Sequence, residues 1–542
     1  MSKKMPTEEP SYLRYKGRYK GLFAWIFSTD HKRIGLMYLY AIMTFFILGA
    51  LLGLSMKFEL LAPGRTIMGA QTYNGFFTLH GITMIFLIVV PGLPAVFGNF
   101  FLPIMIGAKD VAFPRLNLLS WWIYIFGAIV AISSQFMSGH PPDTGWTFYA
   151  PYSFKVSQNL LPAILGAFIL GFSSILTGLN FIVTIHRMRA PGMSWLKMPL
   201  FPWALYGTAW IQLLATPVVG ITLLMVVAER TLHIGFFDPT LGGDPVLYQH
   251  LFWIYSHPAV YIMILPAMGV ISEILPTFAR KPIFGYKAIV ISTLLIAFIG
   301  YFVWGHHMFT AGMSGTAQFA FSFLTFLVAI PSAIKVFNWL ATLYKGSIQL
   351  RTPFYWAASF LFVFMIGGLS GLVLGSVATN IHVHDTAFVV AHFHFIVFGG
   401  VGYAFFAAIH YWFPKIYGRM YDEGWANTGW VIFFGGFLTL YFPMFILGLK
   451  GMPRRYFDYV EEFHGLNVVS SLGAFLMIFG LAMIIINLIR SARYGKPAEQ
   501  NPWGGVTLEW SVPSPPPLEN FREVPVIKND PYDFSKIRHH KK

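Results

Sequence analysis

Long apolar runs separated by short polar segments make up most of the chain. About twelve of these runs have the roughly 20 residues that an α-helix needs to cross a bilayer, so we predict an all-α integral membrane protein. A transmembrane β-barrel would instead show shorter segments of alternating polarity. The predicted spans are residues 34–56, 73–101, 118–137, 160–185, 203–228, 247–275, 285–309, 319–343, 354–377, 387–413, 426–449 and 465–489.

The polar ends and loops predict how the chain is divided and oriented. We expect a basic segment of residues 1–33, a membrane domain of residues 34–490 and a Pro-rich surface tail of residues 491–542. Lys and Arg gather in the first segment and in the loops on its side of the membrane, so both termini are expected to face the cytoplasm. No short apolar core precedes the first span, and therefore we predict no cleavable signal peptide.

Composition and charge narrow the class of protein further. Of the 542 residues, 56% are hydrophobic and 11% are charged, whereas soluble domains are about one quarter charged. The formal net charge of +15 is explained by cationic ends that face anionic lipid, so we expect a lipid bilayer and no nucleic acid as partner. The chain has no cysteine, which excludes disulfides, iron–sulfur clusters and thiolate-bound copper within it.

Two histidines lie in the middle of the predicted span 387–413. His392 and His394 are two residues apart, so on an α-helix they point about 200° from each other. One helix therefore offers an imidazole to each of two neighbouring compartments, which suits two large planar cofactors such as haems. His80 in span 73–101 could supply a further axial ligand, and Gly81 beside it permits close approach of a bulky group.

Three more histidines suggest a metal site. His306 and His307 are adjacent, and His257 precedes a proline that bends its helix. Three neutral imidazoles without a carboxylate favour copper, with zinc as the second choice. Tyr261 follows His257 by four residues and shares its helix face. It could donate a proton and an electron to such a site, although Tyr261 alone would be interpreted as an interfacial aromatic residue.

A lysine within one span and a pair of arginines in an outer loop each allow two interpretations. Lys335 lies within span 319–343, where a charge costs roughly 2.5–3.5 kcal/mol on insertion scales. It indicates either a proton route through Ser332 and Thr325 or a lysine that extends toward the cytoplasmic membrane surface. The adjacent Arg454 and Arg455 in an outer loop indicate either a bound anion or an ordinary solvated loop.

At these residues the sequence resembles subunit I of the haem–copper oxidases, specifically the cytochrome c oxidase family, over nearly the whole chain. The resemblance implies twelve transmembrane helices around two haems, expected to be haem A, and one copper, CuB. It implies four-electron reduction of O2 to water coupled to proton pumping. The implied ligands are His80 and His394 for the low-spin haem, His392 for the high-spin haem, and His257, His306 and His307 for CuB, with Tyr261 cross-linked to His257.

The resemblance also implies contacts outside the ligand set. Relatives have an arginine at the position of Lys57, which places the contact to the haem formyl group in question because lysine lacks the planar guanidinium. The implied contacts are Arg454 and Arg455 to the haem propionates, Lys57 and Trp146 to cofactor, and His384 and Asp385 to a magnesium ion at the subunit interface. Without the resemblance, His384 and Asp385 would be interpreted as an ordinary polar loop.

Two proton routes follow from the same resemblance. One runs from Lys335 through Ser332 and Thr325 to Tyr261. The chain has Ala259 where many relatives have the glutamate that ends the other route, so it resembles the A-type branch in which a Tyr-Ser pair replaces that glutamate. The residues implied for this route are Asp110, Asn99, Asn117, Ser173, Ser174, Tyr255 and Ser256.

The sequence also predicts partner subunits and leaves two rival functions. The chain lacks the cysteines of the copper centre through which electrons enter, so a subunit II must carry that centre, beside subunit III and other membrane subunits. We expect cytochrome c or another haem protein as the donor, in a bacterial cytoplasmic (inner) membrane. The rivals are a nitric oxide reductase of the same superfamily, which Tyr261 and Lys335 disfavour, and a twelve-helix transporter, which leaves the histidine pairs unexplained.

Overall fold

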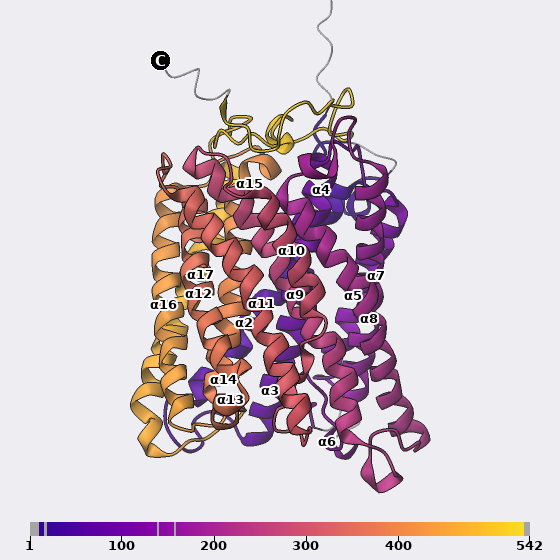
Figure 1. Ribbon diagram of the computed structural model, residues 1–542, viewed down its shortest axis with the longest axis vertical. Coiled ribbons are helices and arrows are strands. Elements are labelled where there is room, and N and C mark those ends of the chain that lie inside the picture. Colours follow the sequence, from indigo (N-terminus) through magenta and orange to yellow (C-terminus); the bar gives the residue numbers. More distant parts are fainter. Residues whose placement is uncertain (1–9, 16–18, 138–139, 157–158, 536–542) are drawn as a thin grey trace, which may run out of the picture.

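The computed structural model describes residues 10–15, 19–137, 140–156 and 159–535, and in these ranges the chain forms a bundle of long helices (Figure 1). Among the described residues, 11 helices are long and apolar enough to cross a membrane. The helices are α1 Phe23–Ile26, α2 His31–Glu59, α3 Ala70–Ile82, α4 Asn99–Met105, α5 Pro114–Ser133, α6 Tyr152–Lys155, α7 Leu160–Arg187, α8 Leu200–Leu232, α9 Pro245–Ala279, α10 Tyr286–Gly300, α11 Gly315–Leu343, α12 Thr352–Gly375, α13 Val377–Val383, α14 Ala387–Phe393, α15 Tyr403–Tyr417, α16 Glu423–Leu449 and α17 His464–Tyr494.

The predicted span 285–309 is shorter in the structure. Helix α10 ends at Gly300, and a 3-10 turn at Trp304–Met308 follows it. A Cβ at Gly300 would lie 2.3 Å from Cε2 of Tyr261, so only glycine lets the end of α10 approach that ring. The turn after this close approach carries His306 and His307.

Two of the predicted spans contain π-helical turns. Helices α3 and α4 are joined by the π segments Thr83–Val89 and Gly92–Gly98, and α14 continues into α15 through His394–Gly402. A π turn shifts the register of a helix and is frequent at functional sites. The π turn begins at His394, directly after the α-helical turn that carries His392.

Small residues let the helices pack closely. A Cβ at Gly166 of α7 would lie 2.5 Å from the backbone nitrogen of Ala131 in α5, and one at Gly473 of α17 would lie 2.2 Å from that of Leu440 in α16. Such contacts between small residues drive helix association in membranes. Helix α9 is the most enclosed span, with 94% of its apolar window buried, and it positions His257 and Tyr261 at the centre of the bundle.

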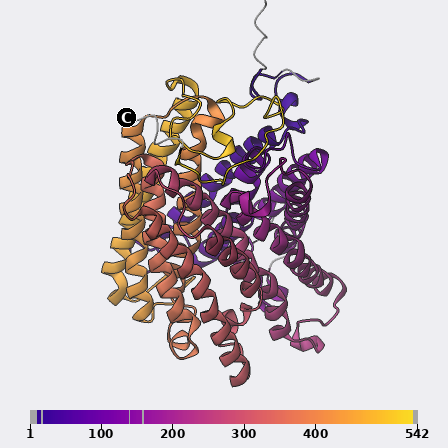
Figure 2. The same cartoon turned by 45° about the horizontal axis from the view of Figure 1, so that its top comes forward.

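The C-terminal segment, residues 495–535, lies across one end of the bundle (Figures 1 and 2). We expected an extended surface tail, but aromatic residues of the segment are buried against the helices. The indole nitrogens of Trp503 and Trp510 donate to the carbonyl and the hydroxyl of Tyr411, at 2.7 and 2.8 Å. The hydroxyl of Tyr532 donates to Oε1 of Glu273 at 2.7 Å.

Candidate metal and cofactor centre

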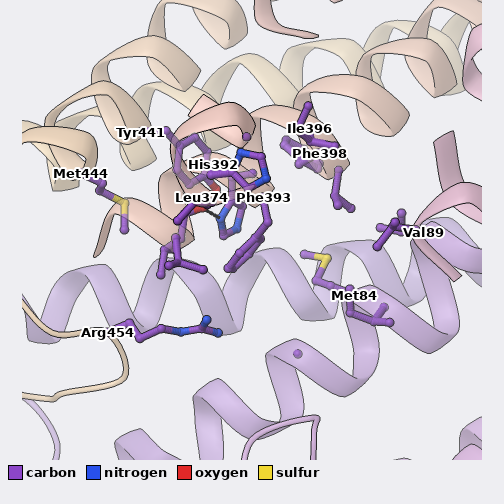
Figure 3. Close-up of a pocket in the computed structure, with 18 of the residues that line it drawn as sticks. Met84, Val89, Leu374, His392, Phe393, Ile396, Phe398, Tyr441, Met444 and Arg454 are labelled. Carbon is purple, nitrogen blue, oxygen red and sulfur yellow. Dashed lines mark hydrogen bonds between the residues drawn. The ribbon is translucent and has the colours of Figure 1, made fainter. Parts of the chain in front are cut away.

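A cavity of about 1120 Å³ lies inside the bundle. Its wall is mostly apolar, and Figure 3 shows His392, Tyr441 and Arg454 around part of it. The predicted ligands all line this one cavity: His80, His257, His306, His307, His392 and His394. The structure therefore brings together side chains that are more than 300 positions apart in sequence.

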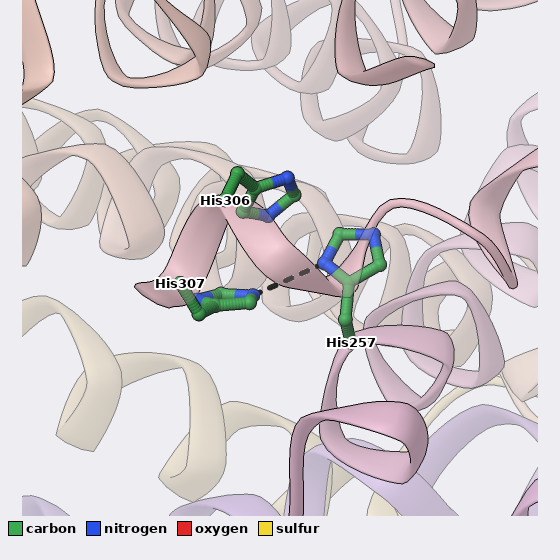
Figure 4. A group of neighbouring side chains, drawn as sticks. All are labelled: His257, His306 and His307. Atoms are coloured by element: carbon green, nitrogen blue, oxygen red, sulfur yellow. Dashed lines mark hydrogen bonds between the residues drawn. The ribbon is translucent and has the colours of Figure 1, made fainter. Parts of the chain in front are cut away.

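His257, His306 and His307 form one compact group (Figure 4). One ligand nitrogen from each lies within 4.8 Å of the others, and Nδ1 of His257 is 3.1 Å from Nε2 of His307. Because the group contains no carboxylate, its donors are those that copper prefers. The ring of Trp253 stacks on His307 at 3.7 Å between centroids, which fixes the plane of that imidazole.

The tautomer of His306 follows from its neighbour. Nδ1 of His306 lies 2.9 Å from Oγ1 of Thr325, while that hydroxyl donates its own proton to the carbonyl of Phe321 at 2.6 Å. Thr325 must therefore accept from Nδ1–H. Nε2 of His306 then has a free lone pair, which a metal requires.

The same reasoning applies to the histidines predicted to bind haem. Nδ1 of His80 lies 2.8 Å from the carbonyl of Gly49, Nδ1 of His394 lies 2.8 Å from that of Val390, and Nδ1 of His392 lies 3.0 Å from that of Gly367. A carbonyl only accepts, so each Nδ1 carries the proton and each Nε2 keeps its lone pair. All three imidazoles are thus prepared to ligate a metal.

Helices on different sides hold His392 and His394. His392 also contacts the hydroxyl of Ser370 in α12 at 3.0 Å, whereas the ring of His394 stacks on Tyr441 of α16 at 4.3 Å. Glycines leave room beside the ligand rings: a Cβ at Gly371 would lie 3.0 Å from Cε1 of His392, and one at Gly53 would lie 3.1 Å from Cε1 of His80.

Two arginines line the cavity near the loop that follows α16. Burial above all, and then the neighbouring Arg455, lowers the pKa of Arg454 to about 9. Its Nη1 is 3.8 Å from Oδ1 of Asp385, and its Nε has no hydrogen-bond partner among the described residues. Two half-buried guanidinium groups with so few hydrogen-bond partners fit an anionic ligand such as a carboxylate.

The other predicted contact residues also line the cavity: Lys57, Trp146, His384 and Asp385. Nζ of Lys57 donates to Oγ of Ser470 at 2.8 Å. A Cβ at Gly81 would lie 3.1 Å from Cβ of Trp146, so this indole packs directly on the segment of His80. Nε2 of His384 lies 3.8 Å from Oδ2 of Asp385, and burial is the main reason that the pKa of His384 is lowered.

The residues of the predicted lysine route line the cavity or are buried. Thr325, Ser332 and Tyr261 line it, and Lys335 is buried at 1% exposure. Nζ of Lys335 donates to Oγ1 of Thr293 in α10 at 2.9 Å. Sequence reasoning missed Thr293, although a threonine in an otherwise apolar helix was the available signal.

Asp110 lies in the loop between α4 and α5. Burial, followed by the charge of Asp30, raises its pKa to about 7. Asn99 and Asn117 are buried, and Oδ1 of each has no hydrogen-bond partner among the described residues. These polar atoms suit a hydrated path, since a water molecule would satisfy them.

Further along, a small cavity of about 30 Å³ lies beside Ser173 and Ser174. Tyr38 lines it too, with its hydroxyl 3.2 Å from Oγ of Ser173. Sequence reasoning did not single out Tyr38. Tyr255 and Ser256 are buried and line the large cavity, as the predicted copper and haem ligands do.

Comparisons with known proteins agree with this geometry. The family described as "Cytochrome C and Quinol oxidase polypeptide I" matches residues 33–476. The chain belongs to this family. It is therefore an oxidoreductase subunit, and its helices are those of a multi-pass membrane protein.

Similar members of the family come from bacteria. Cytochrome c oxidase subunit 1 of Thermostichus vulcanus is 43% identical over 532 residues, which cover 98% of this chain and 96% of the relative. The subunit 1 of Synechocystis sp. is 46% identical, with coverage of 94% and 92%. A solved heme-copper terminal oxidase dimer has a TM-score of 0.74 at 23% identity, over 86% of this chain and 85% of that chain, which shows the shared fold.

Proposed function

We propose that the chain is the catalytic subunit of a terminal respiratory oxidase in a bacterial cytoplasmic membrane. It reduces O2 to water with electrons from cytochrome c and couples this reduction to proton translocation. The observation that carries the proposal is one cavity inside the bundle, lined both by a compact three-histidine group and by three further imidazoles with free Nε2 lone pairs.

The residues present fit two haems and one copper. His80 and His394 would hold the low-spin haem, His392 the high-spin haem, and the group of His257, His306 and His307 the copper. Arg454 and Arg455 would bind the haem carboxylates, for which the guanidinium group is well suited. When bound, the metals supply the electrons that O2 reduction requires.

The chain's own residues orient the ligands and handle protons. Tyr261 holds a proton at its hydroxyl, 2.9 Å from Nε2 of His257, beside the compact histidine group. The apolar wall of the cavity excludes bulk water and thereby limits side reactions. Lys335 is placed to deliver protons toward Tyr261, whereas Asp110 begins the route that ends at Tyr255 and Ser256.

Several finer features belong to the same proposal. Haem A is the haem we propose, and His384 with Asp385 would contribute to a magnesium site at the interface with a second subunit. Because the chain has no cysteine, the copper centre that receives electrons must reside on a subunit II. We also expect subunit III and further membrane subunits in the complex.

The experiment that tests this function uses the purified complex reconstituted in vesicles. Oxygen consumption is followed with reduced cytochrome c and, separately, with ubiquinol, while a pH dye records protons released outside. We expect cytochrome c to sustain turnover with net proton release. Turnover with quinol but not with cytochrome c would show that the electron donor is a quinol and not cytochrome c. The absence of oxygen consumption with either donor would contradict the proposed function.

A further inference from the structure

Asn520 of the C-terminal segment is buried at the loop that carries Asp110. Its side chain is 1% exposed and contacts three parts of the chain at once. Nδ2 donates to the carbonyl of Ala108 at 2.9 Å and to that of Lys109 at 3.1 Å. These carbonyls immediately precede Asp110, so one side chain holds the loop against the start of α2.

The orientation of the Asn520 amide follows from the neighbouring groups. Nδ1 of His31 contacts the carbonyl of Asn99 at 2.7 Å, so it carries the proton and Nε2 accepts. Nδ2 of Asn520 lies 2.9 Å from that Nε2 and is its donor. Oδ1 of Asn520 accepts from Nζ of Lys32 at 2.9 Å. The amide thus uses both its donor and its acceptor side.

Asn520 also takes part in a buried arrangement of charges. Nζ of Lys32 is fully buried and pairs with Oδ2 of Asp30 at 2.9 Å. The charged or titratable groups near the amide are Asp30, His31 and Lys32 at the start of α2, Lys109 and Asp110 on the loop, and Glu519 beside it on the tail. Lys109 pairs with the exposed Glu519 at 2.6 Å.

The charge of Lys32 favours the ionised form of Asp110, and the charge of Asp30 disfavours it. The position of Lys32, which pairs with Asp30, therefore affects the protonation of Asp110. Asn520 fixes that position on one side and the position of the Asp110 loop on the other. No other residue of the C-terminal segment that the structure describes bonds to both Lys32 and the backbone of this loop through its side chain.

We propose that Asn520 is a positioning residue for proton uptake, which holds the Asp110 loop in register with Lys32 and so sets how readily Asp110 exchanges protons with the cytoplasm. This inference rests on the proposed function, in which Asp110 begins a proton route. The C-terminal segment then contributes to proton uptake, in addition to packing on the ends of the helices.

Two substitutions separate the contacts of Asn520. Its backbone has a φ of +62°, which glycine and aspartate both tolerate. Asn520→Gly removes every side-chain contact without backbone strain. Asn520→Asp keeps the acceptor for Lys32, loses both donors and adds a negative charge that raises the pKa of Asp110. Matched controls are Asn501→Gly and Asn501→Asp, because among the described residues the side chain of Asn501 bonds only to the backbone of Gly505 in the same segment.

The test has two readouts on the assembled complex. Hydrogen–deuterium exchange of residues 106–113 reports how firmly Asn520 holds the Asp110 loop. The pH profile of turnover and the proton-to-electron ratio report proton uptake. We expect faster exchange in both Asn520 variants, a lower ratio in Asn520→Gly, and an alkaline shift of the profile by about 0.5 unit or more in Asn520→Asp. The Asn501 variants should match the unsubstituted complex in both readouts.

The exchange readout does not depend on oxidase activity. If the unsubstituted complex consumed no oxygen, the proposed function would fail, while exchange of residues 106–113 would still show whether Asn520 holds the loop. Unchanged exchange in both Asn520 variants would overturn the inference. Faster exchange with an unchanged pH profile and an unchanged proton ratio would also overturn it, because the tether would then have no bearing on proton uptake.

Discussion

The hydroxyl of Tyr261 lies 2.9 Å from Nε2 of His257, and the opposite nitrogen of the same ring lies 3.1 Å from Nε2 of His307. The His257 imidazole therefore contacts the Tyr261 phenol on one side and His307, another member of the three-histidine group, on the other. The two residues are four positions apart on α9, so the helix itself sets this spacing. The arrangement places a proton donor next to the proposed copper.

The first prediction concerns the Tyr261 hydroxyl. Tyr261→Phe keeps the ring but removes the proton, so we expect oxygen consumption to fall by at least about 100-fold, the lower end of what a positioned proton donor contributes. The haem and copper contents should stay unchanged, because the metal ligands remain. Metal analysis and oxygen electrode measurements on the same preparation check both parts. Turnover within a factor of two of the unsubstituted complex would contradict this role.

The second prediction concerns Lys335. Lys335→Met removes the buried charge that donates to Thr293, and we expect turnover to slow by about 10-fold or more because protons no longer reach Tyr261 by this route. Lys287→Met is the control, since Lys287 is exposed at the start of α10. Rapid-mixing spectroscopy should place the delay in the reduction of the high-spin haem. An equal effect of both substitutions would argue for a general loss of structure.

The third prediction concerns Tyr255 and Ser256. Oγ of Ser256 is buried without a partner among the described residues, and both side chains line the cavity. The double substitution Tyr255→Phe with Ser256→Ala should reduce the proton-to-electron ratio, because it removes both hydroxyl groups at the end of the Asp110 route. Dye measurements in vesicles record the ratio, with Thr428→Val as a hydroxyl control, because the exposed Thr428 hydroxyl donates to the carbonyl of Gly424 within α16. Normal pumping by the double variant would remove the pair from the route.

The fourth prediction concerns Glu509 in the C-terminal segment. Burial raises its pKa from an ordinary 4.5 to about 7. The folded chain therefore binds this proton more tightly than the unfolded chain. Between pH 4.5 and 7 the folded state carries more protons, so the stability contributed by this group falls as the pH rises through that window.

We accordingly expect the attachment of residues 500–534 to weaken as the pH rises from 4.5 to about 7. Hydrogen–deuterium exchange of the segment, corrected for its intrinsic pH dependence, measures this change. Glu509→Gln should flatten the dependence, whereas Glu519→Gln, at an exposed carboxylate of the same segment, should leave it in place. A flat profile in the unsubstituted complex would show that Glu509 does not control the attachment.

Much of the fold was predictable because a bilayer requires continuous apolar runs. The multi-pass helical class is confirmed, and the runs coincide with the spans that the structure describes. The exception is α10, which ends early where Gly300 meets Tyr261. Such a contact between distant segments leaves no trace in hydrophobicity, so a single sequence does not reveal where this helix stops.

The candidate ligands were visible in the sequence because charged and titratable groups within spans are rare. The six histidines of the cavity that are proposed to bind haem or copper were all singled out, and their roles stay predictions. Residues that act through long-range contacts were missed. Thr293 bonds to Lys335 from another helix, and Asn520 reaches Lys32 across nearly the full length of the chain. Neither contact follows from a local pattern.

The central claim is that the cavity holds two different haems, one with two histidine ligands and one with an open position beside copper. The most direct measurement is a reduced-minus-oxidised optical spectrum of the purified complex, with and without carbon monoxide. We expect two haem signals, with only the signal of the His392 haem shifted by carbon monoxide and an α-band in the red as haem A gives. A folded complex without any haem signal would contradict the account and leave the proton-coupled transporter as the explanation of the buried histidines.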